Sequence, residues 1–181
     1  AAFAFLLFAA NYMYQSLVTT HEGDNFASGN GNTEHTQQQS NVIPAPDFIV
    51  YDAQGNRVAL SDFHGKPIVV NFWASWCGPC KKEMPTFESL YQRMGNEIPF
   101  LMINMTDGSR ETVASASGFI VEQGYTFPVF YDTTTEAAMT YGAYSLPTTF
   151  FIDANGYAVA RATGAIDADT LQRGIDLIYS A

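Results

Sequence analysis

The chain has 181 residues, 47% of them hydrophobic, so it can bury one ordinary core but not two large ones. Eighteen acidic residues against eight basic ones give a net charge of -10, which repels phosphate backbones and anionic lipid headgroups and excludes nucleic acid as an expected partner. The two cysteines lie three positions apart and cannot cross-link distant parts of a fold. We therefore expect one folded domain that is stabilised by burial.

The first twenty residues carry no charge and are rich in Ala, Phe and Leu. About 20 apolar residues suffice for a helix that spans a bilayer, so residues 1–20 are interpreted as a transmembrane anchor or a signal-peptide remnant, in preference to a buried soluble helix. Residues 21–43 are polar and have the composition of a flexible linker. No Lys or Arg follows the apolar run before Arg57, and this charge pattern predicts that the domain lies outside the cytoplasm.

Residues 44–181 are predicted to form the domain. The segments DFIVYD (47–52) and RVALSDF (57–63) flank a turn and predict a hairpin. KPIVVNFWA (66–74) is a continuous apolar run, typical of a fully buried strand. Residues 77–94 follow a helical pattern in which apolar positions form one stripe. The charged residues predicted to face solvent on this helix are Lys81, Lys82, Glu83, Glu88 and Arg93.

The second half alternates between strand and helix patterns. Strands are predicted at 98–105, 127–132, 145–153 and 157–163, and helices at 109–124, 133–142 and 167–181. Asn155-Gly156 between two apolar runs is the strongest hairpin signal in the chain. Together these elements predict an α/β fold with a mixed central sheet and helices on both faces.

The segment WCGPC holds both cysteines, which could bind a metal, form a structural disulfide or exchange two electrons. Cys77 lies where a buried strand passes into a helix, and the unpaired N–H groups of the first helical turn favour a thiolate there. Cys77 is therefore the expected nucleophile, and Cys80, one turn further, is the expected resolving thiol. Gly78 allows the turn, and Pro79 presets helical backbone angles.

The other two uses of the cysteines are disfavoured. A loop this small constrains few unfolded conformations, so an inert disulfide would add little stability. A structural metal site needs about four ligands, and His21, His35 and His64 lack paired spacing. We expect no metal and no cofactor beyond a redox-active disulfide between Cys77 and Cys80.

WCGPC, preceded by NFWA and followed by LPTTFFID (146–153), resembles the thioredoxin fold. More closely, SDFHGKPIVVNFWASWCGPCKKEMP (61–85), the helix SRETVASASGFIVEQG (109–124) before FPVFYD, and YGAYSLPTTFFIDANGYAV (141–159) resemble the membrane-anchored TlpA/ResA-type thiol-disulfide oxidoreductases. The resemblance covers residues 44–181. It implies a thioredoxin fold with an N-terminal β-hairpin and a central αβ insertion.

The resemblance also implies a substrate-binding surface. Pro147 matches the family's cis-proline, which packs against the cysteines, and Leu146-Pro147 would hold a substrate strand. Trp76, just past the buried strand, is interpreted as an exposed lid over the site, whereas Trp73 is interpreted as core. Four further aromatic residues are assigned to the core: Phe127, Phe130, Phe150 and Phe151.

At two positions where related proteins carry an acidic residue, this sequence has a neutral one. Thioredoxins carry a buried Asp where this chain has Asn71, and some ResA-type proteins carry a Glu where it has Gly78. An amide cannot take up a proton at neutral pH. The proton of Cys80 must then go to water, to the substrate or to a carboxylate that the sequence does not identify.

By resemblance, Gly-Pro between the cysteines is the reducing type, and strong oxidants usually carry His there. The chain is thus expected to be an extracytoplasmic reductase of protein disulfides, supplied with electrons by a membrane donor of the CcdA/DsbD type. Its client could be apocytochrome c during maturation or another oxidised protein. A peroxiredoxin is disfavoured because Ala74 occupies the position of the Thr or Ser in that family's motif, and a non-catalytic binding module is disfavoured by the intact CxxC.

Overall fold

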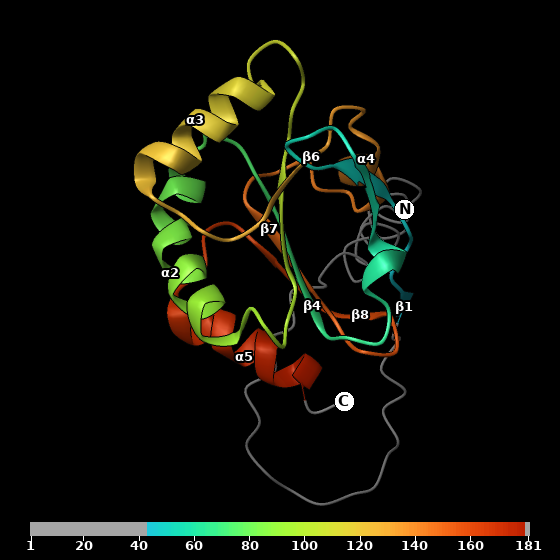
Figure 1. The fold of residues 1–181 in the computed structure, drawn as a ribbon. Helices are drawn as coiled ribbons and strands as arrows, with labels where there is room; N and C mark the ends of the chain where they lie inside the picture. Colours follow the sequence, from blue (N-terminus) through green and yellow to red (C-terminus); the bar gives the residue numbers. More distant parts are fainter. Residues whose placement is uncertain (1–42, 180–181) are drawn as a thin grey trace, which may run out of the picture. The chain divides into compact units, whose positions relative to one another are not determined.

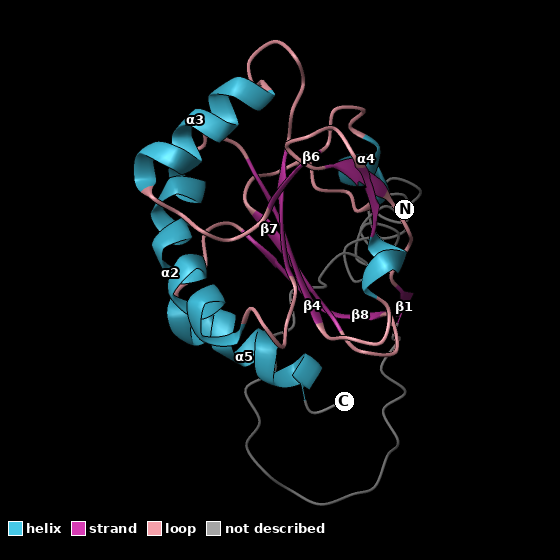
Figure 2. Ribbon diagram, viewed as in Figure 1, coloured by secondary structure: helices cyan, strands magenta, loops and turns pink. Residues whose placement is uncertain are grey.

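The structure is a computed structural model, and it describes residues 43–179. Strands and helices alternate along the chain as the sequence predicts (Figures 1 and 2). The strands are β1 (Ile43–Pro44), β2 (Ile49–Tyr51), β3 (Arg57–Ala59), β4 (Ile68–Trp73), β5 (Phe100–Asn104), β6 (Val129–Tyr131), β7 (Thr148–Ile152) and β8 (Tyr157–Thr163). The helices are the 3-10 helix η1 (Leu60–Phe63) and the α-helices α2 (Gly78–Met94), α3 (Val113–Gln123), α4 (Glu136–Thr140) and α5 (Ala168–Tyr179).

The strands of this region form one mixed sheet in the order β1-β8-β7-β4-β5-β6-β2-β3. β4 lies near the middle, parallel to β5 and antiparallel to β7. All six residues of β4 are buried, because helices and loops cover both faces of the sheet at this point. The predicted mixed sheet is therefore confirmed, and its most buried strand is the one that leads to the cysteines.

Alternate residues of β4 enter two separate cores. Val69 and Trp73 pack under α2, α3 and α5, whereas Val70 and Phe72 pack on the other face, with η1 and α4. Figure 1 shows α2, α3 and α5 along one side of the sheet and α4 on the other. This alternation places the side chain of Asn71 on the α2 face, in the layer that also contains the cysteines.

Several predicted elements are longer than the observed ones, among them the helix predicted at 133–142, which spans Glu136–Thr140. The helix predicted from residue 109 begins at Val113, because Thr112 caps it and Asp107 holds the preceding residues in a turn through the N–H groups of Ser109 and Glu111. The second arm of the first hairpin ends at Ala59 and continues as η1.

The predicted anchor, residues 1–20, lies outside the described residues, as does the linker apart from Ile43. Between residues 43 and 179 there is no helix with the length and hydropathy required to span a bilayer.

Candidate active site

Cys77 lies at the junction of β4 and α2, as predicted. After Trp73 the chain turns so that the N–H of Cys77 donates to the carbonyl of Ala74 at 3.1 Å. Cys77 then caps α2, and its Sγ accepts the N–H of Cys80 at 3.2 Å. Gly78 and Pro79 form the first turn of the helix. The arrangement aims the positive end of a helix dipole at one sulfur, which stabilises its thiolate form.

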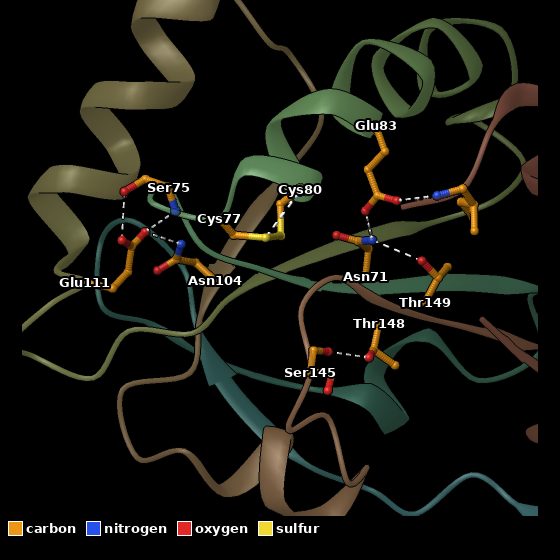
Figure 3. Close-up of a disulfide and its surroundings, with 11 residues drawn as sticks. Asn71, Ser75, Cys77, Cys80, Glu83, Asn104, Glu111, Ser145, Thr148 and Thr149 are labelled. Atoms are coloured by element: carbon orange, nitrogen blue, oxygen red, sulfur yellow. Dashed lines mark hydrogen bonds between the residues drawn. A yellow bond between two sulfur atoms is a disulfide. The ribbon is translucent and has the colours of Figure 1, made fainter. Parts of the chain in front are cut away.

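Cys77 and Cys80 are joined as a disulfide (Figure 3). The side chain of Cys77 is 4% exposed, and that of Cys80 is fully buried. Cys77 also lines a surface cavity of about 600 Å³. The difference in exposure is smaller than expected for an open nucleophile, but its direction agrees with the prediction that substrates meet Cys77 first.

The cavity beside Cys77 has a largely apolar rim. Its lining includes Trp76, Leu146, Met139 and Tyr144, and the last two are well exposed. Trp76 is 41% exposed, which confirms that it lies outside the core, whereas Trp73 is buried as predicted. Such a rim can hold an extended peptide against the disulfide by contact with its side chains.

The Leu146-Pro147 peptide bond is cis, as the resemblance implies. Within the described region Leu146 contributes to the cavity lining, but Pro147 does not. Pro147 is buried, and its carbonyl accepts the N–H of Gly164 at 2.9 Å. The four core phenylalanines of the sequence analysis are all buried.

An arginine covers the exposed tryptophan of the rim. The guanidinium carbon of Arg110 lies 3.6 Å from the centre of the Trp76 ring, and both residues line the cavity. A cation over an aromatic face is attracted by the ring's quadrupole. Arg110 and Trp76 therefore form one stacked pair in the cavity lining beside Cys77.

The prediction that Glu83 faces solvent is wrong. Its side chain is only 2% exposed, because residue 83 falls on the buried stripe of α2 together with Met84, Phe87 and Leu90. One carboxylate oxygen accepts the side-chain N–H of Asn71 at 2.8 Å, and the other accepts the N–H of Ile166 at 3.0 Å. Burial raises the pKa of Glu83 to about 7, although these two hydrogen bonds lower it in part.

The side chain of Asn71 lies between the Glu83 carboxylate and the disulfide (Figure 3). Its amide nitrogen also donates to Thr149 Oγ1 at 3.0 Å, while its Oδ1 is buried and has no hydrogen-bond partner among the described residues. Figure 3 shows Oδ1 pointing toward the disulfide and the amide nitrogen toward Glu83. Asn71 therefore cannot itself accept a proton at neutral pH, but its amide nitrogen binds the buried carboxylate of Glu83.

Sequence reasoning missed Glu83 because charged residues usually face solvent. The helical spacing contained a signal, since residues 80, 83, 84, 87 and 90 mark one face of α2. A single carboxylate within such a stripe, three residues after a catalytic cysteine, indicates a buried acid. Among residues 43–179, no group of three or more His, Cys, Asp or Glu side chains is placed to hold a metal ion.

Residues 43–161 match the AhpC/TSA family. The chain belongs to this family. It is 36% identical over 137 residues to the thiol-disulfide oxidoreductase ResA of Geobacillus thermodenitrificans, which covers 74% of this chain and 75% of the relative. Together with the Cys77–Cys80 disulfide at the start of α2, this similarity identifies the chain as a ResA-like thiol-disulfide oxidoreductase.

Solved structures agree on the thioredoxin-like fold. A putative thiol:disulfide interchange protein DsbE from Chlorobium tepidum superimposes with a TM-score of 0.67 at 28% identity, over 76% of this chain and 96% of that one. The exposed lipoprotein thioredoxin Etrx1 from Streptococcus pneumoniae superimposes with a TM-score of 0.61 at 30% identity, over 72% and 99%. The predicted thioredoxin fold with its inserted helix is thus confirmed.

Proposed function

We propose that this oxidoreductase reduces protein disulfides outside the cytoplasm. The observation that carries the proposal is the combination of a Cys77 sulfur at a helix N-terminus beside the surface cavity with a buried acid, Glu83, one turn beyond Cys80. The first feature suits attack on a substrate disulfide, and the second suits removal of the proton from the shielded thiol.

In the reduced enzyme, the Cys77 thiolate attacks one sulfur of a substrate disulfide, and the other substrate sulfur leaves as a thiolate. Cys80 then loses its proton and attacks Cys77 Sγ. The bond between Cys77 and the substrate breaks, the second substrate sulfur leaves, and the Cys77–Cys80 disulfide remains. Two electrons have passed to the substrate, and an external dithiol must return them.

Glu83 is the carboxylate that the sequence analysis left unidentified. A group with a pKa of about 7 is half ionised at neutral pH, which is the condition under which a general base is most effective. In this proposal Glu83 accepts the proton of Cys80, and Asn71 holds the Glu83 carboxylate through the 2.8 Å hydrogen bond.

The direction of electron flow rests on the residues between the cysteines. Gly78 and Pro79 are the reducing pair in related proteins, and neither is the His of strong oxidants. Reduction potentials are about -270 mV for thioredoxin and about -120 mV for DsbA. We expect a midpoint potential more negative than roughly -200 mV for this dithiol.

The location and the partners are inferred from the N-terminal sequence and the relatives. Residues 1–20 have the composition of an anchor or signal peptide, and Etrx1, at 30% identity, is described as an exposed lipoprotein. An extracytoplasmic dithiol needs electrons from a membrane donor, for which the CcdA/DsbD type is the candidate. Apocytochrome c and other oxidised extracytoplasmic proteins are the candidate clients.

A redox titration tests the direction. The protein is equilibrated with glutathione or dithiothreitol buffers of known potential and followed by the fluorescence of Trp76 and Trp73. A midpoint more negative than roughly -200 mV supports the reductase, whereas a value near -120 mV would make the protein an oxidant that forms disulfides. Turnover of insulin in the wild type, lost in Cys77→Ser, separates an enzyme from a non-catalytic binding module.

A further inference from the structure

A second buried carboxylate lies on the other side of the disulfide from Glu83. Glu111 belongs to the loop between β5 and α3, and its side chain is fully buried. Figure 3 shows it beside the turn that precedes Cys77. The mechanism above does not use this residue, and the sequence analysis placed it on a helix.

Glu111 accepts three hydrogen bonds with its two carboxylate oxygens. Oε1 accepts the backbone N–H of Ser75 at 2.8 Å and the side-chain N–H of Asn104 at 2.7 Å. Oε2 accepts the hydroxyl of Ser75 at 2.7 Å. The backbone and amide groups can only donate, so both require the acceptor Oε1, whereas the Ser75 hydroxyl at Oε2 could also accept a hydrogen bond from an amide nitrogen.

The loop that carries Glu111 is itself well fixed. Asp107 Oδ1 accepts the N–H of Glu111 at 2.9 Å, and the carbonyl of Glu111 accepts the N–H of Gly108 at 2.9 Å. Asn104, at the end of β5, accepts the hydroxyl of Thr106 at 2.8 Å through its Oδ1. Glu111 therefore connects two rigid points, the end of β5 and the turn before α2.

Ser75 is the partner that relates this cluster to catalysis. It lies two residues before Cys77, within the turn that the Cys77 N–H to Ala74 carbonyl bond closes. The position of Cys77 Sγ relative to the first N–H groups of α2 depends on the geometry of this turn. With the N–H and the hydroxyl of Ser75 held by one carboxylate, the turn has little freedom to move.

A purely structural role would be served at lower cost by apolar residues. A buried carboxylate loses its hydration, and well-packed hydrophobic side chains are often as stable in its place. On the same molecule, Glu88 fixes a loop in the same manner, since it accepts the N–H and hydroxyl of Thr126 and the N–H of Phe127. Glu88 lies three helical turns from Cys77 and is only partly buried.

We propose that Glu111 is a positioning residue for the nucleophile: through Ser75 it holds the turn before α2, so that Cys77 Sγ stays at the helix N-terminus, where the thiolate is stabilised. This role does not depend on the direction in which electrons run. It follows from the hydrogen bonds and burial of Glu111.

The test measures Cys77 alone, in a Cys80→Ser background, by thiolate absorbance against pH and by the rate of alkylation at neutral pH. Glu111→Ala should raise the pKa of Cys77 and slow alkylation by about tenfold, because a displaced sulfur loses the helix N–H groups. Glu111→Gln, which can keep all three hydrogen bonds without the negative charge, should remain close to the wild type. Glu88→Ala is the matched control and should leave both measurements unchanged.

The sign of the shift distinguishes positioning from a simple charge effect. If Glu111 acted only as a nearby negative charge, its removal would lower the pKa of Cys77 in both variants. That result would overturn the proposal, as would an equal rise in Glu88→Ala. Should Glu111→Ala fail to fold, Ser75→Ala decides, because it removes only the hydroxyl contact and should shift the pKa of Cys77 upward by a smaller amount.

Discussion

At the scale of single residues, the chemistry depends on which side chains are removed from water. Cys80 and Glu83 share the buried face of α2, and Asn71 meets them from β4. Burial disfavours the charged form of an acid, so a glutamate that would ionise below pH 5 in water remains half protonated near neutrality. The raised pKa of Glu83 suits proton transfer, and it also makes the free energy of unfolding depend on pH.

The stability of the oxidised protein should therefore depend on Glu83 between about pH 4.5 and pH 7. In this window the folded state keeps the proton that the unfolded state releases, so unfolding becomes easier as the pH rises. Glu83→Gln removes this dependence. The free energy of unfolding of the variant minus that of the wild type should be higher at pH 8 than at pH 4 by up to about 3 kcal/mol.

Denaturant unfolding of both proteins across this pH range measures the effect. The cysteines do not interfere, because they are joined as a disulfide in the oxidised state. The absolute difference at one pH also contains the hydrogen bond that glutamine cannot make to Ile166 or Asn71, so the change with pH is the relevant quantity. Parallel curves for the two proteins would show that Glu83 titrates normally.

At the scale of elements, the packing of α5 on the sheet depends on a glycine. Gly174 lies in the middle of α5, and a Cβ at this position would lie 2.1 Å from the ring of Phe151 on β7. This close approach brings the buried residues Leu171, Ile175 and Ile178 of the helix onto the core under α2. The helix can thus cover the sheet only because residue 174 has no side chain.

Gly174→Ala should destabilise the protein even though alanine favours helices. The gain in helix propensity is about 1 kcal/mol, whereas overpacking a core typically costs about 1–3 kcal/mol. We expect a net loss of up to about 2 kcal/mol in the free energy of unfolding, measured by denaturant titration.

Gly118→Ala in α3 is the matched control, because nothing lies within 4 Å of its added Cβ. This variant should be as stable as the wild type or slightly more stable. A Gly174→Ala protein that behaves like Gly118→Ala would contradict the packing explanation.

At the scale of the whole molecule, the two hydrophobic cores lie on opposite faces of one sheet, between the sheet and the elements that cover it. The buried hydrophobic residues of the described region extend from Phe48 to Ile178, within one compact unit. The elements that hold the disulfide, the cavity and Glu83 belong to this unit as well. Folding and dithiol exchange should therefore require nothing from residues 1–38.

A protein that lacks residues 1–38 should unfold cooperatively, with the same midpoint temperature as the full chain, because the loss of these residues removes none of the core contacts described here. It should also reduce insulin at the same rate. Thermal unfolding and the insulin assay on both proteins check this expectation. A lower midpoint temperature or a slower turnover would show that the N-terminal segment contributes to the domain.

Much of this architecture could be read along the chain because it depends on local patterns. The apolar run of β4, the Asn-Gly turn before β8 and the CxxC at a strand-to-helix junction each lie within a few consecutive residues, and the backbone converts them directly into strand, hairpin and N-cap. The fold class, the two catalytic cysteines and the exposure of Trp76 follow from such patterns.

The tertiary structure alone decided which groups the buried polar side chains contact. Glu83 meets Asn71 and Ile166, and Glu111 meets Ser75, across 12, 83 and 36 positions of sequence. Gly174 is required by a ring on another element. These contacts depend on the rotation of a helix and the path of a loop relative to the sheet, which are set when the elements pack together, and no local pattern contains that information.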